Sequence, residues 1–216
     1  MAAMSEPRAQ IAIVDYGMGN LRSAAKAFEH IGARITVSAD HGTLAAADAL
    51  VLPGVGAFPE AIRRIDERGL AEPIRERVAA GAPLLGICLG MQLLFESSTE
   101  NGGAEGLGLL GGHVDALRAG DLKAPHIGWT PVGRHRDSAL TAALPAAGEP
   151  FYFVHSFVVR PRPEHLLATS RYGEEFAAIV GDGRVFGAQF HPEKSSAAGL
   201  RMLADFAAIA APVEVG

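Results

Sequence analysis

The only cysteine of the 216-residue chain, Cys88, lies between Gly86 and Gly90 in the segment PLLGICLGMQLLFE, residues 83–96. Strand-like residues precede it and helix-like residues follow it, so the segment is a cysteine version of the G-x-S-x-G nucleophile elbow. Glycines permit a turn too sharp for residues that carry a Cβ atom. The sulfur is then presented at a helix start, where unpaired N–H groups stabilise a thiolate. A buried cysteine that only packs is the alternative.

A nucleophilic thiol requires a base and a group that orients the base. The segment QFHPEKS, residues 189–195, contains both kinds of residue. His191 can take the thiol proton, and the Glu193 carboxylate can fix the imidazole tautomer and stabilise the imidazolium. The two side chains face the same way if the segment is extended, which Pro192 favours. A solvated surface pair is the alternative.

Carbonyl chemistry at the sulfur also requires N–H donors for an oxyanion. We expect one from Leu89, directly after the cysteine. The second is expected from LPGVGAF, residues 52–58, where Gly54, Val55 and Gly56 form a turn that can direct backbone N–H groups toward a ligand. A plain strand-to-helix loop is the alternative. All three segments follow predicted strands, and open α/β sheets bind ligands at this edge.

The first half of the chain alternates between predicted strands and helices. Asn20 can cap the first helix, and Gly32 can end it. Strands are predicted at 10–17, 33–39, 48–56 and 83–87, with helical stretches between them and over 89–97. Such alternation implies crossover connections and a parallel sheet covered on both faces. The fold class is therefore α/β, doubly wound, with a mostly parallel sheet flanked by helices.

Closely spaced strand-like runs replace this alternation after about residue 110. The GDGR turn joins two of them, so we expect antiparallel strands added to the same sheet. A last helix is predicted over 195–210, and irregular loops over 97–106 and 136–150. We expect a single domain over residues 10–210, with terminal tails at 1–9 and 211–216.

Composition excludes several function classes. The net charge is −5, which leaves no basic surface for nucleic acid. A single cysteine forms no internal disulfide, so a cytoplasmic location fits best. No segment reads as a signal peptide or a membrane span. We expect neither a metal nor an organic cofactor.

Taken together, LPGVGAF, GICLGMQLLFE and QFHPEKS resemble the class I (triad) glutamine amidotransferases, which implies a flavodoxin-like core. The resemblance implies a glutaminase with a Cys-His-Glu triad. Cys88 would attack the side-chain amide of L-glutamine, ammonia would leave, and water would release glutamate from the thioester.

Three further segments resemble one branch of that family, the glutaminase subunits of imidazole glycerol phosphate synthases of histidine biosynthesis. They are DYGMGNLRS (15–23), APHIGWT (124–130) and FYFVHSF (151–157). This branch implies a heterodimer with a separate cyclase that is built as a (β/α)₈ barrel. The cyclase would use the ammonia to make imidazole glycerol phosphate and AICAR.

The resemblance also implies roles for residues outside the triad. Candidates to position glutamine are Gln92, Glu96, Tyr152, His155, Ser156 and Phe157. Candidates for the partner interface are Asn20 and Lys194. Two positions depart from the commonest family pattern, since Thr130 stands where asparagine is frequent and Phe157 where tyrosine is frequent.

Three other functions are compatible with these residues. A class I glutaminase of another synthase, of the anthranilate or GMP type, would share the triad. A free-standing cysteine hydrolase or peptidase would act without a partner. A regulatory module without activity would use the pocket only to bind.

Overall fold

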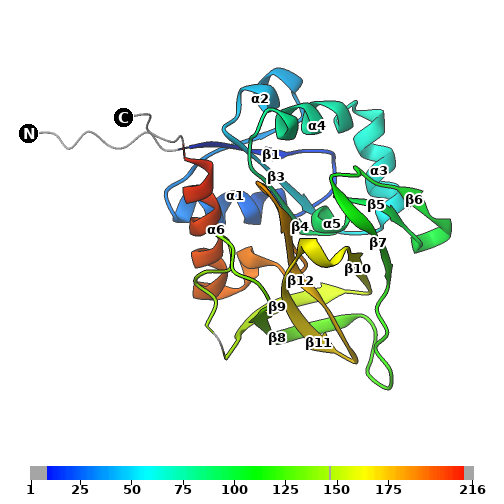
Figure 1. Cartoon of the computed structure of the whole chain (residues 1–216). Coiled ribbons are helices and arrows are strands. Elements are labelled where there is room, and N and C mark those ends of the chain that lie inside the picture. The colour runs from blue at the N-terminus through cyan, green and yellow to red at the C-terminus, as the bar shows by residue number, and fades with distance from the viewer. Residues whose placement is uncertain (1–8, 146, 212–216) are drawn as a thin grey trace, which may run out of the picture.

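The centre of the structure is a mixed sheet with strand order β2-β1-β3-β4-β13-β12-β11-β8-β9 (Figure 1). This computed structural model describes residues 9–145 and 147–211, so most of the two predicted tails lies outside the described residues. The strands are β1 (Gln10–Val14), β2 (Arg34–Ser38), β3 (Ala49–Gly54), β4 (Leu84–Cys88), β8 (His126–Arg134), β9 (Glu149–His155), β11 (Leu166–Tyr172), β12 (Glu174–Asp182) and β13 (Val185–Ala188).

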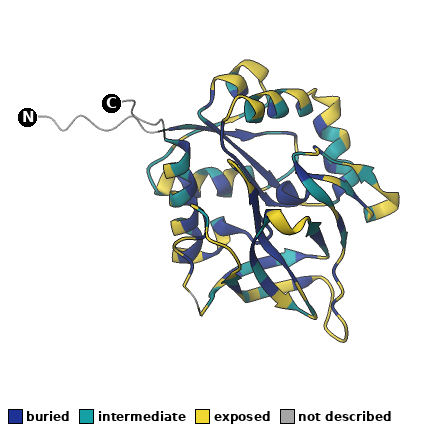
Figure 2. Ribbon diagram, viewed as in Figure 1, coloured by how far each residue is buried: buried dark blue, intermediate teal, exposed yellow. Residues whose placement is uncertain are grey.

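Helices cover both faces of the parallel half of this sheet. On one face lie α1 (Leu21–His30) and α6 (Ser196–Ala210), and on the other α2 (His41–Ala46), α3 (Phe58–Glu67) and α4 (Ala71–Ala79). Side chains alternate accordingly, since Ile11 and Ile13 pack with α1 and α6 while Ala12 and Val14 pack with the other helices. The central strands β1, β3, β4 and β13 are buried on both faces, whereas the edge strand β2 is partly exposed (Figure 2).

The second half of the chain extends the sheet with antiparallel strands. Strand β13 pairs parallel with β4, and from β13 onward each neighbour is antiparallel, through β12, β11, β8 and β9. This confirms the predicted α/β class with its antiparallel additions. It also places β13 at the junction, next to the strand that ends at Cys88.

A second, four-stranded sheet was not expected from the sequence. Its order is β10-β7-β5-β6, formed by β5 (Phe95–Ser98), β6 (Ala104–Glu105), β7 (Leu110–Ala116) and β10 (Phe157–Pro161). The run FYFVHSFVVR is divided at Ser156, so its halves β9 and β10 belong to different sheets. The segment 97–106, predicted as an irregular loop, contains the end of β5, a 3₁₀ turn and β6.

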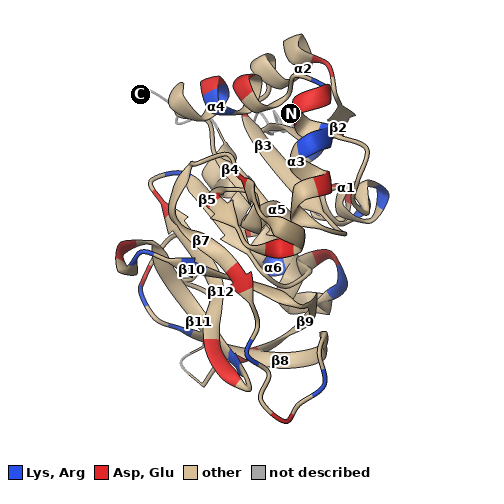
Figure 3. Cartoon of the chain, turned by 90° about the vertical axis from the view of Figure 1, so that its right-hand side faces the viewer, with Lys and Arg blue, Asp and Glu red and all other residues tan. Residues whose placement is uncertain are grey.

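Charged residues lie mainly on the outer helices and loops. The face seen in Figure 3 carries basic and acidic residues side by side. On α3, for example, Arg63 and Arg64 both pair with Glu60. Within the described ranges, no helix has the length and apolar character needed to cross a membrane.

Candidate active site

Cys88 is the last residue of β4 and adopts a backbone conformation that residues other than glycine rarely adopt, with φ 55° and ψ −112°. The turn is tight on both sides. A Cβ atom at Gly90 would lie 1.7 Å from the Leu52 carbonyl oxygen, and one at Gly86 would lie 2.6 Å from that of Gly90. The two glycines therefore allow the strained turn that presents the sulfur.

The helix after the elbow is shorter than predicted. Helix α5 spans only Leu89–Gln92, because the chain turns at Leu93 and enters β5 at Phe95. The carbonyls of Leu93 and Leu94 are taken by N–H groups of the segment 107–110 instead of a continuing helix. One turn carries little macrodipole, so stabilisation of a thiolate falls to the local N–H groups.

His191 and Glu193 form a buried pair beside the elbow. The imidazole Nδ1 lies 2.8 Å from Glu193 Oε1, and each side chain is only 3% exposed. Pro192–Lys194 is a 3₁₀ turn and not the extended segment that we expected, and this turn brings the two side chains together. Ser195, which the sequence reasoning missed, donates to the His191 carbonyl and accepts from the backbone N–H of Tyr152, so it anchors this turn.

Opposing effects act on the pKa of His191. Burial, the largest effect, lowers it, but the charge of Cys88 together with the hydrogen bond and charge of Glu193 outweighs burial and raises the pKa to about 9. At neutral pH His191 is therefore an imidazolium whose Nδ1–H donates to the carboxylate. Its Nε2 has no hydrogen-bond partner among the described residues.

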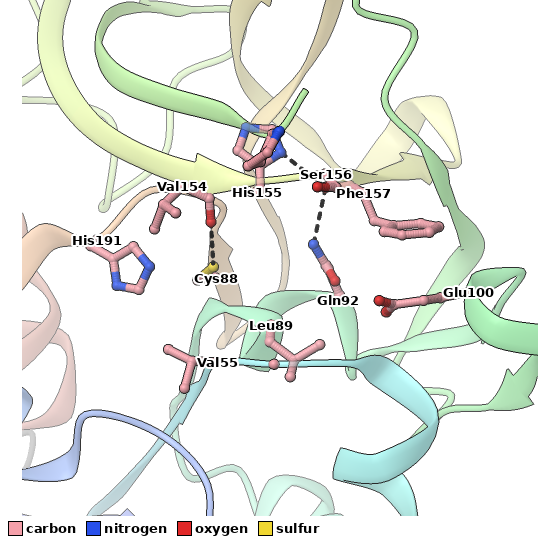
Figure 4. A pocket seen from close by; sticks show the side chains of 12 residues that line it. Val55, Cys88, Leu89, Gln92, Glu100, Val154, His155, Ser156, Phe157 and His191 are labelled. Carbon is pink, nitrogen blue, oxygen red and sulfur yellow. Dashed lines mark hydrogen bonds between the residues drawn. The ribbon is translucent and has the colours of Figure 1, made fainter. Parts of the chain in front are cut away.

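The sheet brings the sulfur and this imidazole to the same edge. Strand β13 ends at Ala188, opposite Ile87, so Cys88 and the segment that follows β13 lie at the same edge of the sheet. Cys88 is 6% exposed, and its sulfur lies 3.8 Å from the Val154 carbonyl oxygen and 3.8 Å from Gln189 Nε2. Figure 4 shows the His191 ring beside this sulfur.

The glycine-rich turn after β3 lies on the other side of the cysteine. Gly54 is opposite Cys88 in the parallel register. Val55 and Gly56 line the pocket, and Gly56 has φ 99°, a conformation that favours glycine. The segment proposed to supply an oxyanion donor is therefore adjacent to the nucleophile, together with Leu89, which also lines the pocket.

These segments enclose a pocket of about 330 Å³. Cys88 and His191 lie at one end and Glu100 at the other, with Gln92 between them (Figure 4). The chemistry of this lining suits a small polar ligand, because a nucleophile, an amide and a carboxylate face the same space.

Glu100 is a pocket residue that the sequence reasoning missed. It lies in the 3₁₀ turn Glu100–Gly102, and its Oε2 accepts a hydrogen bond of 2.8 Å from the backbone N–H of Phe58, the first residue of α3. The residue before α3, Ala57, cannot cap this helix with its side chain. No sequence pattern indicated this role, because Glu100 lies in the segment 97–106, which was predicted to be an irregular loop.

A known protein family matches nearly all of the described chain. The family described as glutamine amidotransferase class-I matches residues 12–210. The chain belongs to the class I glutamine amidotransferases. The match covers the elbow, the turn after β3 and the His191–Glu193 pair.

Curated proteins of similar sequence align with almost the whole of this amidotransferase chain. Imidazole glycerol phosphate synthase subunit HisH of Moorella thermoacetica is 50% identical over 91% of this chain and 93% of its own length. The subunit of the same name from Rhodopirellula baltica is 49% identical over 95% of this chain and 99% of its own length. The one from Bacillus licheniformis is 52% identical over 91% of this chain and 94% of its own length.

Solved structures share the fold of the amidotransferase at lower identity. PurLQS from Thermotoga maritima superposes with a TM-score of 0.74 at 21% identity, covering 94% of this chain and 99% of that one. A putative GMP synthase protein from Thermoplasma acidophilum gives 0.70 at 20% identity, with 94% of each chain covered. These two similarities concern the fold alone.

The residues expected to hold glutamine divide into two groups in this amidotransferase. Gln92, His155, Ser156 and Phe157 line the pocket, whereas Glu96 and Tyr152 are not among its lining residues. Glu96 lies on strand β5, not on a helix, and its exposed carboxylate pairs with Arg162 and the Gly112 N–H. Tyr152 packs on the outer side against Trp129 and Lys194.

A chain of hydrogen bonds behind the pocket fixes two histidine tautomers. Because the Phe157 carbonyl can only accept, His155 Nδ1 donates to it at 2.9 Å, and His155 Nε2 accepts from His126 Nδ1 at 3.0 Å. Thr130, the departure from the commonest pattern, then donates to His126 Nε2 at 2.8 Å. Burial lowers the pKa of both histidines, that of His155 to about 4, so both are neutral.

The Phe157 carbonyl also accepts from Gln92 Nε2, 3.1 Å away. The backbone at 157 thus positions Gln92 without the hydroxyl that a tyrosine would add, and the phenyl ring still lines the pocket.

The two residues expected at a partner interface lie on the surface. Asn20 caps α1 by accepting from the Ser23 N–H, and it is exposed. Lys194 lies 5.9 Å from the centre of the Tyr152 ring, which packs edge-on against Trp129. Trp129 is 52% exposed, and Ile127 on the same face of β8 is also exposed.

Proposed function

We propose that this chain is the glutaminase subunit of an imidazole glycerol phosphate synthase. It hydrolyses L-glutamine to glutamate and ammonia and passes the ammonia to a cyclase in histidine biosynthesis. The observation that carries the proposal is the strained elbow of Cys88 beside the buried His191–Glu193 pair, in a chain about half identical to three subunits of that name.

The first half-reaction forms a thioester. The Cys88 thiolate attacks the side-chain amide carbon, and the carbonyl oxygen becomes an oxyanion that accepts hydrogen bonds from the N–H groups of Leu89 and the turn 54–56. Each such donor contributes about 100-fold to 1000-fold to the rate in well-studied hydrolases. His191, held by Glu193, donates its proton to the departing nitrogen, which leaves as ammonia.

The second half-reaction hydrolyses the thioester. His191, now neutral, takes a proton from water, and the resulting hydroxide equivalent attacks the thioester carbon. The carbon–sulfur bond breaks, glutamate leaves, and the thiolate and imidazolium are restored. Throughout both steps Glu100 suits the α-ammonium group of glutamine, because its carboxylate faces the end of the pocket opposite the sulfur.

The ammonia requires a shielded path, because in water it is protonated and ceases to be a nucleophile. We infer a heterodimer with a separate (β/α)₈-barrel cyclase, in the cytoplasm. The exposed face around Trp129, Tyr152 and Lys194 suits a docking surface, since exposed aromatic residues are enriched at interfaces. This face adjoins the mouth of the pocket through Val154, which lies opposite Ile127 in the strand pair.

The alternative functions share the triad but differ in their partners. A component of an anthranilate or GMP synthase is disfavoured, because the relatives near 50% identity carry the imidazole glycerol phosphate synthase name. A free-standing hydrolase would turn over glutamine or peptides alone. An inactive module would leave Cys88 unlabelled by an electrophilic glutamine analogue such as a diazo-ketone.

The decisive experiment measures glutamate release by wild type and by Cys88→Ala, each with and without the cyclase and the cyclase's nucleotide substrate. Turnover is expected only for wild type in the loaded complex. Equal turnover by the isolated chain would refute dependence on a partner, and turnover by Cys88→Ala would refute the assigned nucleophile.

A further inference from the structure

The hydroxyl of Tyr16 is buried without a partner. Tyr16 lies two residues beyond the end of β1, and it is 0% exposed. Its Oη forms no hydrogen bond to any residue in the described ranges 9–145 and 147–211. Buried tyrosine hydroxyls usually have a partner, because an unpaired one loses the hydrogen bonds that water would supply. This hydroxyl therefore requires an explanation.

The Tyr16 hydroxyl lies against the turn that follows β3. A Cβ atom built on Gly54 would lie 2.6 Å from Tyr16 Oη, so the hydroxyl packs against the glycine itself. The same point is 2.7 Å from the Gly90 nitrogen and 2.9 Å from the Leu89 Cβ. Tyr16 belongs to the core cluster under the turn and is not among the pocket-lining residues, so it contacts the turn from behind.

Peptide geometry connects this position to the oxyanion. In a trans peptide the N–H and the C=O point in opposite directions. When the Val55 N–H points into the pocket, the carbonyl of Gly54 must point toward the interior. A carbonyl buried there requires a donor. The tyrosine hydroxyl can donate, and it lies against Gly54.

We propose that Tyr16 is a positioning residue whose hydroxyl donates to the Gly54 carbonyl when the Val55 N–H faces the oxyanion. The proposal rests on the proposed function, because only a reaction that builds negative charge on a carbonyl oxygen at Cys88 requires that arrangement. The hydroxyl is then satisfied in the arrangement of the turn that stabilises the transition state.

The ionisation state of Tyr16 fits this role. Burial, and to a smaller extent the charge of Cys88, raise the pKa of Tyr16 well above its ordinary value. The phenol therefore keeps its proton throughout the pH range of the reaction and remains a donor.

The test is Tyr16→Phe in the complex with the cyclase and its nucleotide substrate. This change removes one oxygen atom and keeps the ring. We expect kcat for glutamine to fall about 3-fold to 10-fold, the value of one hydrogen bond, with KM unchanged. The matched control is Tyr172→Phe, which removes a hydroxyl that donates to the Lys123 carbonyl at 2.8 Å, and its kcat is expected to equal that of wild type.

Alkylation of Cys88 by iodoacetamide separates positioning of the turn from other effects. This substitution forms no oxyanion, so its rate is expected to be the same in Tyr16→Phe and wild type. The thermal midpoint of Tyr16→Phe is expected to equal or exceed that of wild type, because an unpaired buried hydroxyl is removed.

Three outcomes would overturn the proposal. They are an unchanged kcat, a parallel loss of alkylation rate, and a fall in kcat accompanied by a lower thermal midpoint. If the wild-type complex does not hydrolyse glutamine at all, the proposed function fails and this proposal fails with it. Turnover by wild type with an unchanged Tyr16→Phe kcat overturns this proposal alone.

Discussion

Gly90→Ala perturbs the site through one added methyl group. The new Cβ would lie 1.7 Å from the Leu52 carbonyl oxygen and 2.7 Å from the Leu52 carbonyl carbon. Ordinary carbon–oxygen contacts begin near 3.3 Å, so the two backbones must separate by roughly 1.6 Å. Because neither atom belongs to a flexible side chain, the displacement falls on α5 or on the end of β3.

Either displacement moves the sulfur away from its oxyanion donors, since β3 leads into the turn 54–56 and α5 begins directly after Cys88. A misplacement of about 1 Å can reduce the rate about 100-fold. We therefore expect kcat for glutamine in the loaded complex to fall by about 100-fold or more. Overpacking of this kind also lowers the free energy of unfolding by about 1–3 kcal/mol, which urea denaturation measures.

Gly133→Ala is the matched control for the same chemical change. A Cβ atom there has no neighbour within 4 Å, and its φ is outside the left-handed region. Both kcat and the urea midpoint should remain close to those of wild type. If a normally folded Gly90→Ala chain turned over glutamine within about threefold of wild type, the argument from the close approach at Leu52 would be wrong.

Three further predictions concern charge, substrate and partner. In a pH profile, kcat for glutamine should fall above about pH 9, because His191 there loses the proton that it donates to the departing nitrogen. Glu193→Gln should shift this fall to lower pH, because the Glu193 charge that raises the pKa of His191 is removed. Glu100→Gln should raise KM for glutamine about 10-fold to 100-fold in initial-rate assays, through loss of a charged hydrogen bond, while the amide oxygen still caps α3. Trp129→Ala should weaken cyclase binding by ~2 kcal/mol, about 30-fold in Kd by calorimetry, with the thermal midpoint unchanged; an unchanged Kd would exclude this face as the docking surface.

Local sequence predicted the elements that meet at the site. Short apolar runs located β1, β3 and β4, and glycines at 86 and 90 predicted the sharp turn, because both effects depend on near neighbours. The structure confirms the turn through the backbone of Cys88. The pairing of β13 with β4 was not predictable in this way, since it joins residues a hundred positions apart.

The errors arose where tertiary contacts override local pattern. Leu93, Leu94 and Phe95 read as a continuing helix, but strand pairing with the second sheet ends α5 after Gln92. That single change turns Glu96 outward to Arg162 and brings Glu100 to the pocket. Tyr152 was assigned to the pocket by resemblance to the family, and alternation along β9 places it on the face of the sheet that also carries Trp129.

The late position of β13 in the chain affects the order in which the protein can become active during synthesis. Strand β4 and Cys88 emerge from the ribosome about a hundred residues before Val185–Ala188 and His191. A nascent chain that has completed only its first half carries the thiol without a proton donor beside it. Unfinished chains therefore do not hydrolyse glutamine in the cell, because the general acid His191 is translated only after β13.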